Sequence, residues 1–381
     1  MRGSGGMLFV FFVVNFPGAR AGTGIRGACL GAGKLVSLAD VRGPGSAGGW
    51  SIYNFVTPDT KIISALRANP DGVSGADLAS QLGISRAALW ARIEELRQAG
   101  FQIEAGPHFG YRLTGEPDGL IADDLLARLG VTQVVGRDIH VFQETASTND
   151  VMEKLARDGA REGVVVFAES QTRGRGRLGR KWVSPGHKGL WFSVLLRPVM
   201  HPQEATQLTV MAATAMRRAI RSVTGLNPQI KWPNDILLNG KKVAGILTEL
   251  SAELDRVRHV IIGIGVNLNL TVDEFPPELR ALATSLRIEA GQEQSRPEVA
   301  AAVLRELDAD YARLRAGQFA AVADEWETHC ATVGRQVSVQ MGERKLVGCA
   351  EALDDDGALL LRTEHGHLER IIGGDVTLEK T

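Results

Sequence analysis

The 381-residue chain has only three cysteines, and their spacing indicates neither a disulfide framework nor a zinc site. Cys29, Cys330 and Cys349 are far apart and include no C-x-x-C pair, which fits a reducing cytoplasm. Net charge is also nearly absent, at -1 with a pI of about 6.7, so the composition predicts no general affinity for polyanions. The apolar run from Met7 to Val14 is too short to span a membrane, and we expect no membrane partner.

Residues 1–56 differ from the rest of the chain, and we interpret them as a disordered extension or as the result of a start codon chosen too early. They are rich in glycine, alanine and arginine and have no sustained hydrophobic period. A signal peptide is disfavoured because the apolar run is short and a cytoplasmic-looking set of domains follows. The segment from Ala28 to Leu35 resembles a P-loop but lacks its first glycine and its Ser or Thr, so we reject a nucleotide site there.

Residues 57–116 predict a winged helix-turn-helix. Apolar residues at helical spacing indicate three short helices, and Ser74 and Ser85 stand where caps of the second and third would be. Gly83 would end the second helix. The segment from Phe101 to Leu113 predicts a hairpin, which would be the wing.

DNA contacts of such a module would come from the start of the third helix, where base edges are read. The candidate residues are Ser85, Arg86, Ala87 and Trp90. Between residues 57 and 117 there are six Lys and Arg against seven Asp and Glu, so electrostatic affinity for phosphates should be weak. Dimerisation would compensate for this, and a regulatory or vestigial module without DNA binding is the alternative.

Residues 117–330 predict an α/β domain, because strand and helix patterns alternate after a linker-like Glu116–Gly119. Two buried strands, Gly163–Ala168 and Gly189–Leu196, flank a basic loop, Gln171–Trp182. The loop holds four arginines, one lysine and three glycines, which favours an anionic ligand. It contains a G-x-G-x-x-G, but neither the helix nor the acidic residue of a dinucleotide site follows. A solvated basic turn is the other interpretation.

A second unusual stretch, Lys231–Asp235, predicts a pocket wall close to a hairpin turn at Asn239-Gly240. Lys242 follows on the next strand, and it is either solvated or directed into the site. The strand Val260–Gly265 ends with small residues and with Asn267, whose amide suits a polar ligand. Beyond residue 331, five short strands separated by glycine and aspartate turns predict a small barrel over residues 331–381.

Together these stretches resemble the bifunctional bacterial biotin–protein ligases over roughly residues 58–381. Four motifs occur in the family's order: Gly174-Arg-Gly-Arg-x-Gly-Arg-Lys-Trp182, Lys231-Trp-Pro-Asn-Asp235, Lys242-x-Ala-Gly-Ile-Leu247 and Gly263-Ile-Gly-x-Asn267. The resemblance implies an α/β catalytic domain of the biotin/lipoate ligase type, an N-terminal winged helix-turn-helix and a C-terminal SH3-like barrel. Leu178 departs from the best-known bacterial form, which has a further arginine there, and this puts loop ordering and dimer-linked repression in doubt.

The resemblance also implies a reaction and partners. Biotin and ATP with Mg²⁺ would give biotinoyl-5′-AMP, which a lysine of the biotin carboxyl carrier protein of acetyl-CoA carboxylase would attack. A second role as a biotin-responsive repressor implies operator DNA and a homodimer when liganded. The alternatives are a lipoate-type ligase, which the arginine-rich loop argues against, and a ligand-sensing DNA-binding regulator without ligase activity.

The family's ligand contacts fall on residues from three parts of this chain. The resemblance assigns biotin to Ser147, Thr148, Asn149, Gln171, Gly174, Arg175, Arg177, Lys242 and Gly245. It assigns ATP and the adenylate to Arg177, Arg180, Trp182, Asn234, Lys242 and Asn267. Lys242, Arg177 and Asp235 are the expected catalytic residues, with Asp235 either a magnesium ligand or the group that orients Lys242.

Overall fold

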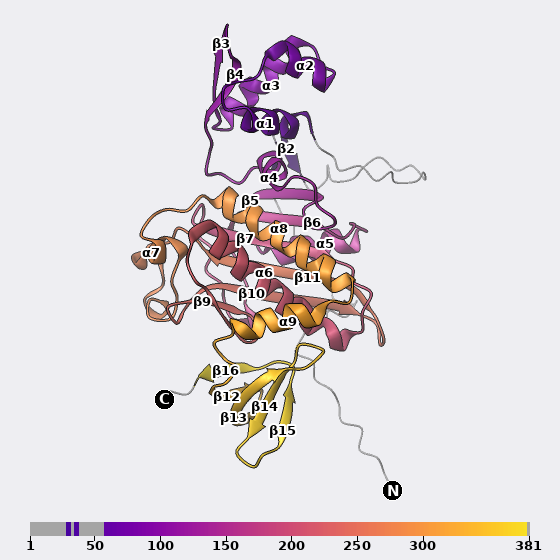
Figure 1. The fold of residues 1–381 in the computed structure, drawn as a ribbon, viewed down its shortest axis with the longest axis vertical. Coiled ribbons are helices and arrows are strands. Elements are labelled where there is room, and N and C mark those ends of the chain that lie inside the picture. Colours follow the sequence, from indigo (N-terminus) through magenta and orange to yellow (C-terminus); the bar gives the residue numbers. More distant parts are fainter. Residues whose placement is uncertain (1–27, 32–33, 38–56, 379–381) are drawn as a thin grey trace.

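A nine-stranded sheet lies at the centre of the computed structural model, which describes residues 28–31, 34–37 and 57–378 (Figure 1). Its strand order is β2-β1-β5-β6-β7-β11-β10-β9-β8, and only β5 and β6 pair in parallel among the described strands. The strands of the catalytic domain are β5 (Asp138–Thr145), β6 (Val164–Gln171), β7 (Gly189–Leu196), β8 (Gln229–Lys231), β9 (Asp235–Leu238), β10 (Lys241–Ala252) and β11 (Val257–Asn267). The two predicted strands around the basic loop are confirmed as β6 and β7.

Helices cover both faces of this sheet, as an α/β fold requires for strands that are apolar throughout. One face is covered by α4 (Ala122–Leu129), α6 (Thr206–Thr224), α8 (Arg296–Arg315) and α9 (Phe319–Thr328), and the opposite face by α5 (Thr148–Arg157). Residues 202–205 form a separate 3₁₀ turn, and α6 begins directly after it at Thr206. Pro202 stands at the start of that turn, where its missing N–H is not required.

A segment after β11 carries the short elements η3 (Val272–Glu274), η4 (Pro277–Leu279) and α7 (Leu286–Ala290). Its main chain is tied to β10, because Lys242 N donates to Leu282 O at 2.8 Å and Thr284 N donates to Lys242 O at 2.9 Å. The segment therefore closes one side of the sheet next to Lys242.

The winged helix-turn-helix is confirmed, and it stands at one end of the molecule (Figure 1). It consists of α1 (Pro58–Ala68), α2 (Gly75–Leu82), α3 (Arg86–Gln98) and the hairpin of β3 (Gln102–Gly106) and β4 (Gly110–Gly115). The hydroxyls of Ser74 and Ser85 accept from the main chain at the starts of α2 and α3, and Gly83 ends α2 at φ 65°. These caps satisfy backbone groups that a helix end leaves unpaired.

The connection expected to be a linker is instead held by a cluster of charged side chains. Arg67 of α1 contacts Glu116 and Asp124, both at 2.6 Å, and Arg128 contacts the same two carboxylates. Asp124 is almost fully buried. The winged module is thus fixed to α4, and through α4 to α8, rather than tethered by a free chain.

The C-terminal barrel is confirmed as a five-stranded antiparallel sheet of order β15-β14-β13-β12-β16. Its strands are β12 (Gln336–Met341), β13 (Arg344–Leu353), β14 (Leu359–Thr363), β15 (Leu368–Ile371) and β16 (Asp375–Leu378). Apolar side chains of the barrel share one core with α9, so the barrel is packed against the catalytic domain.

Eight residues of the N-terminal extension are described, and they differ from the expectation of a disordered segment. They form β1 (Ala28–Gly31) and β2 (Lys34–Ser37), an antiparallel pair at the edge of the central sheet. Cys29 of β1 pairs with Phe142 of β5. Periodicity gave no sign of these strands, because a two-strand pairing of four residues each is too short to show one. The remaining residues up to 56 lie outside the described part.

Candidate active site

A cavity of about 540 Å³ lies where the basic loop, β9, β10, β11 and the barrel strand β16 meet. It is lined by almost all of the ligand residues predicted from the sequence: Ser147, Thr148, Asn149, Gln171, Arg175, Arg177, Arg180, Trp182, Asn234, Asp235, Lys242, Gly245 and Asn267. Gly174 is the exception, since it is buried behind the loop. Residues far apart in sequence thus converge on one pocket, as a substrate site requires.

A larger cavity, about 1090 Å³, lies around the other ends of β10 and β11, and none of the predicted ligand residues lines it. Its charged side chains pair with one another: His259 contacts Glu153 at 2.9 Å and Arg258 contacts Glu253 at 2.6 Å. The smaller cavity is therefore the candidate site, because it gathers the predicted ligand residues and includes Arg177, for which no ion pair is found among the described residues.

Glycines in the pocket floor make room for the functional side chains. A Cβ on Gly265 would lie 2.4 Å from Trp182 Cε2, and one on Gly263 would lie 2.3 Å from Asn149 Oδ1. A Cβ on Gly245 would lie 3.0 Å from both Trp182 and Lys242. Real Cβ atoms do not approach so closely, so the glycines near the end of β11 leave the space that the side chains of Trp182 and Asn149 occupy.

The inner end of the pocket is a network of hydroxyl and amide groups that ends on the carboxylate of Glu249. Thr148 N donates to Gln171 Oε1 at 2.9 Å, and Ser193 Oγ lies 2.7 Å from Thr148 Oγ1 and 2.6 Å from Asn149 Oδ1. Asn149 Nδ2 donates to Glu249 Oε2 at 2.8 Å. Hydroxyls and amides fixed by one another suit a neutral polar ligand, because little freedom is lost when it binds.

The basic loop is folded back on itself and anchored at its base. Arg173 N donates to Ala146 O at 2.8 Å, and Trp182 N donates to Gly174 O at 2.9 Å. A Cβ on Gly174 would lie 2.4 Å from Trp182 O, which explains a glycine at this close approach. Leu178 at the tip is a non-glycine residue at φ 55° and is about half exposed. The backbone at the base of the loop is therefore held in place by hydrogen bonds, and the arginine side chains extend from it.

Two arginines of this loop have different surroundings. Arg175 Nη1 lies 2.6 Å from Asp150, and Nη2 lies 3.3 Å from Glu249. Burial by itself would lower the pKa of Arg175, but the hydrogen bond to Asp150 and the charge of Glu249 raise it overall. Arg175 is thus already neutralised by carboxylates and anchors the loop.

Arg177 has only neutral hydrogen-bond partners in the structure. Its Nη1 donates to Asn234 Oδ1 at 3.2 Å and to Gly374 O at 3.4 Å. Burial therefore lowers the pKa of Arg177, and the more distant Asp375 and Asp235 offset this only in part. A buried guanidinium without a directly bonded anion is ready to accept one.

Lys242 lies on the opposite wall. Its Nζ is 2.6 Å from Asp235 Oδ1 and 5.2 Å from the centroid of the Trp182 ring. Of the two placements open for Lys242 in the sequence, the structure has the one directed into the pocket, while the neighbouring Val243 is fully buried. Trp182 in turn meets Trp191 edge to face at 6.4 Å, and its buried Nε1 has no hydrogen-bond partner among the described residues. Lys242, Asp235 and Trp182 form one unit.

The remaining predicted residues make hydrogen bonds and one ion pair that stabilise the walls of the pocket. Asn234 Nδ2 donates to Ile246 O at 2.7 Å, and Asn267 Nδ2 donates to Thr284 O at 3.1 Å. Arg180 forms an ion pair with Asp375 of β16, so the barrel closes the outer side of the pocket. The nearby Asn269 is not available to a ligand, because its Nδ2 donates to Gln294 O and its Oδ1 accepts from Gln294 N, both at 2.9 Å.

Sequence reasoning missed three kinds of residue in this site. Ser193 sits in an all-buried strand, where a serine among apolar residues was the available signal. Asp150 and Glu249, the partners of Arg175, carry no local signal, because the pairing joins segments 25 and 74 residues away. Asp375 was missed as well, because only the packing of the barrel against the catalytic domain brings this residue to the pocket.

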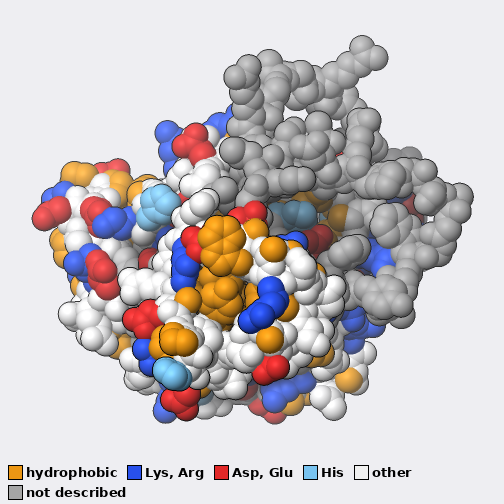
Figure 2. All heavy atoms as spheres, turned by 90° about the horizontal axis from the view of Figure 1, so that it is seen from above, with side chains coloured by type: hydrophobic (Ala, Val, Ile, Leu, Met, Phe, Trp, Pro, Cys, Tyr) orange, Lys and Arg blue, Asp and Glu red, His pale blue; other side chains and the backbone are white. Residues whose placement is uncertain are grey.

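The DNA residues predicted from the sequence lie far from this pocket, on α3 at the end of the molecule. Arg86, Ala87 and Trp90 are exposed, with 57% of Trp90 accessible, while Ser85 caps the helix. Figure 2, which looks onto this end, shows hydrophobic side chains gathered between lysine and arginine side chains. The surface offered is thus apolar with few cations.

Most basic side chains of the module already have carboxylate partners. Besides Arg67, the pairs are Arg92–Asp59 at 2.8 Å, Arg97–Glu94 at 2.5 Å and Arg112–Glu104 at 2.6 Å. Within the described part of the module, Lys61 and Arg86 alone among its six Lys and Arg have no ion pair. The electrostatic affinity of the module for phosphates, which the charge count already predicts to be weak, is therefore weaker still.

Comparison with known proteins places all three domains. Residues 141–267 match the biotin/lipoate A/B protein ligase family, 59–112 an HTH domain, and 332–378 the biotin protein ligase C-terminal domain. The bifunctional ligase/repressor BirA of Bacillus subtilis is 39% identical over 313 residues, covering 82% of this chain and 95% of that protein. The Escherichia coli protein of the same name is 32% identical, covering 84% and 97%.

A solved structure is similar to part of the chain. The biotin protein ligase from Aquifex aeolicus, in complex with biotin and ATP, is 32% identical with a TM-score of 0.55. It covers 64% of this chain, and 99% of that protein is matched.

Proposed function

The chain belongs to the family of bifunctional biotin–protein ligase/repressors, and we propose that its pocket joins biotin to ATP and passes biotin to a carrier lysine. One observation carries the residue assignment: two cations, Arg177 and Lys242, line the same pocket as a set of hydroxyl and amide groups that hydrogen-bond to one another. Adenylation joins two anions, a carboxylate and a triphosphate, so such charges lower its barrier. Neither alternative, a lipoate-type ligase or a regulator without ligase activity, is favoured by relatives matched over their full length.

Biotin is assigned to the inner end of the pocket. The hydroxyls and amides of Ser147, Thr148, Asn149 and Gln171 would hold its uncharged ring system, with Ser193 fixing two of them. Its carboxylate would then point toward Lys242 and Gly245. Gly174 and Arg175 support this end indirectly, since Gly174 sets the fold of the loop and Arg175 is held by Asp150 and Glu249.

The nucleotide is assigned to the outer end, between the loop and β9. Trp182 offers a ring face for adenine, and Arg177, Arg180, Asn234 and Asn267 surround the position of the phosphates. In the first step a biotin carboxylate oxygen attacks the α-phosphorus and the bond to pyrophosphate breaks. Lys242 would hold both reacting groups and neutralise the charge that develops between them.

Asp235 fits the role of orienting Lys242 better than that of a magnesium ligand. Its Oδ1 is 2.6 Å from Lys242 Nζ, so this carboxylate oxygen is already occupied by the lysine. Magnesium in nucleotide enzymes is bound mainly by the phosphates with one or two carboxylates, where it neutralises their charge. We therefore assign Mg²⁺ to the incoming nucleotide and Asp235 to the lysine.

In the second step the amine of a carrier lysine attacks the carboxyl carbon of the adenylate, an amide forms and AMP leaves. The protein needs no covalent intermediate for this, so no nucleophilic side chain is required. The carrier is proposed to be the biotin carboxyl carrier protein of acetyl-CoA carboxylase, because relatives from Mycobacterium tuberculosis and Paracoccus denitrificans are named as ligases for that carboxylase.

The second role is repression at operator DNA, read by Arg86, Ala87 and Trp90 with Ser85 as the helix cap. With so few unpaired cations, one module would bind weakly, so a homodimer of liganded chains is part of the proposal. No described helix is both long and apolar enough to cross a bilayer.

The ligase assignment is tested by incubating the full chain with biotin, MgATP and a biotin carboxyl carrier domain, followed by a streptavidin blot. The expected result is a labelled carrier that depends on ATP and is lost when the carrier lysine is replaced by arginine. An unlabelled carrier with active enzyme from a relative as the positive control would overturn the assignment.

A further inference from the structure

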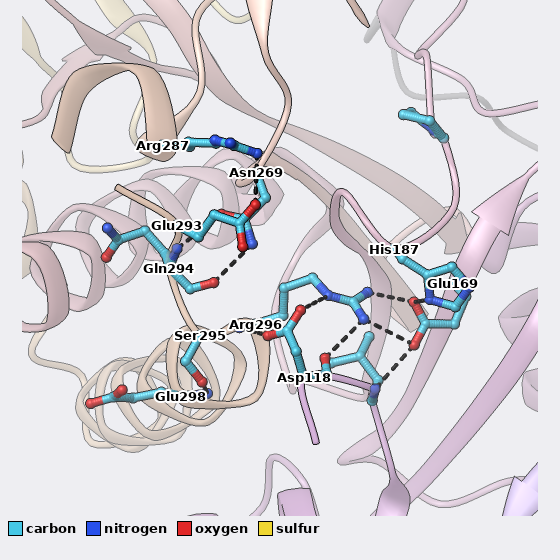
Figure 3. A network of polar contacts seen from close by, with 12 residues as sticks. Asp118, Glu169, His187, Asn269, Arg287, Glu293, Gln294, Ser295, Arg296 and Glu298 are labelled. Carbon is cyan, nitrogen blue, oxygen red and sulfur yellow. Dashed lines mark hydrogen bonds and ion pairs between the residues drawn. The ribbon is translucent and has the colours of Figure 1, made fainter. Parts of the chain in front are cut away.

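A buried carboxylate, Glu169 on β6, joins the start of the catalytic domain to the segment that follows the ligand loop (Figure 3). Its side chain is 3% exposed. Oε1 accepts from Leu120 N at 3.0 Å, and Oε2 forms an ion pair with Arg296 and lies 3.1 Å from His187 Nδ1. Three separate segments therefore meet on one carboxylate that the chemistry does not use.

Arg296 extends this contact to the junction with the winged module. It is the first residue of α8, and it is 1% exposed. Its N and Nε donate to the two carboxylate oxygens of Asp118 at 2.9 Å each, and Nη2 donates to Asp118 O at 2.8 Å. Asp118 and Leu120, just after the winged module, are thus held from both sides.

In the other direction the contact reaches the ligand pocket. Gln171 is two residues beyond Glu169 on the same strand, and its Nε2 donates to Ser184 Oγ at 2.9 Å. Ser184 and His187 belong to the return segment, residues 183–188, which connects the basic loop to β7. The return segment is therefore fixed to β6 at two places, by Gln171 at its start and by Glu169 near its end.

His187 shows that this attachment shapes the segment. It is a non-glycine residue at φ 59°, a conformation that most side chains disfavour, and 65% of its side chain is exposed. Its Nδ1 lies 3.1 Å from Glu169 Oε2, and this contact ties the exposed ring back to β6. Loss of the Glu169 charge would remove the attachment near the end of the return segment and leave the buried Arg296 guanidinium with Asp118 as its one remaining carboxylate partner.

We propose that Glu169 is a positioning residue that couples the junction of the winged module to the ligand loop. Through Arg296 it fixes Asp118, and through His187 it fixes the segment on which the loop closes. In this proposal occupancy of the pocket shifts the placement of the DNA-reading module, and thermodynamic linkage makes that effect reciprocal. The inference rests on the proposed function only in its probes, biotinoyl-AMP and operator DNA.

A matched pair of variants separates positioning from general stability. Glu169→Gln removes one buried carboxylate that pairs with an arginine, and Asp310→Asn removes another. Asp310 is fully buried and lies 2.6 Å from Arg218, but it contacts neither the junction nor the loop. Both variants should unfold at lower temperature than the parent.

Only Glu169→Gln should change the coupled properties of the full chain. We expect biotinoyl-AMP to dissociate faster in a chase experiment. We also expect the ratio of operator Kd values without and with the adenylate to fall about fivefold or more, the lower end of typical coupling factors. Asp310→Asn should leave both quantities within twofold of the parent.

Two surface variants keep the test decisive if Glu169→Gln folds poorly. His187→Ala and Asp118→Asn lie at the two outer ends of the network and are exposed enough to be tolerated. Each should reduce the same ratio, and His187→Ala, whose side chain is 65% exposed, should do so without lowering the unfolding temperature. Unchanged ratios in both, or equal changes in Glu169→Gln and Asp310→Asn, would overturn the proposal. A parent that forms no adenylate would instead count against the proposed ligase function, whereas adenylate without any effect on operator binding would overturn the coupling.

Discussion

Operator binding by this chain should depend on salt much less than binding by most DNA-reading proteins. Of the six basic side chains in the module, four are neutralised by carboxylates at 2.5–2.8 Å, which leaves Lys61 and Arg86 for phosphates. The slope of log Kobs against log salt is about -0.9 per phosphate neutralised, so two contacts give about -1.8 for each bound chain. Between 50 and 200 mM salt the affinity of one chain should then fall only about 12-fold.

The assay is a fluorescence anisotropy titration of a labelled operator at several salt concentrations, with saturating biotin and ATP. Stoichiometry is measured in the same cell, because two chains on one operator double the expected slope to about -3.6. Arg86→Ala should reduce the slope by about one unit per chain. Arg97→Ala is the control, since Arg97 is occupied by Glu94 and by Ile103 O.

A slope steeper than about -6 for two chains would refute this reasoning. It would mean that ion pairs such as Arg112–Glu104 open on DNA and release their arginines to phosphates. In that case Arg112→Ala, and not Arg86→Ala, would cause the larger reduction.

Three further predictions concern the pocket. Lys242→Ala should slow adenylate formation by roughly 100- to 1000-fold, the effect of about 3 to 4 kcal/mol, while transfer from preformed biotinoyl-AMP changes little. Pyrophosphate release and carrier labelling measure the two half-reactions separately, and equal slowing of both would contradict this role of Lys242. Arg177→Gly should release the adenylate roughly ten- to a hundredfold faster, since a hydrogen bond to a charged group is worth about 1.5 to 3 kcal/mol. Biotin should then appear on serum albumin at matched carrier labelling, and no gain in albumin labelling would show that Arg177 does not retain the adenylate. Gly265→Ala should raise the KM for ATP, because the added Cβ would lie 2.4 Å from Trp182, whereas Gly119→Ala should leave this KM unchanged, because there is open space around Gly119. A KM equal to that of the parent in Gly265→Ala would argue against a nucleotide role for Trp182.

The sequence predicted the elements of this fold better than their connections. The strands around the basic loop and the caps at Ser74 and Ser85 depend on neighbours within a few residues, and local patterns contain that information. The hairpin at Asn239-Gly240 is of the same kind, with both residues at positive φ. Short-range chemistry was therefore sufficient for most helices and strands.

Contacts between distant segments were not predictable in the same way. The Arg296–Glu169 ion pair joins residues 127 positions apart, and nothing near either residue indicates its partner. The carboxylates around Arg175 present the same difficulty, so the sequence could not separate an anchoring arginine from Arg177, which is open to a ligand. Which charge is already neutralised depends on how β10 lies against α5, and this follows only from the complete fold.

The charge balance of the module also bears on how a ligase acts as a repressor. A chain with two available cations would hold DNA non-specifically with a Kd near the weak end of about 10⁻⁴ to 10⁻⁶ M at physiological salt. Joining two such modules makes the second contact intramolecular, which raises overall affinity by about 10² to 10⁴. Assembly, rather than any change in the DNA-reading surface, would then decide whether an operator is occupied. If liganded chains pair, a carrier that consumes the adenylate withdraws them from the operator, and demand for biotinylation sets the level of repression.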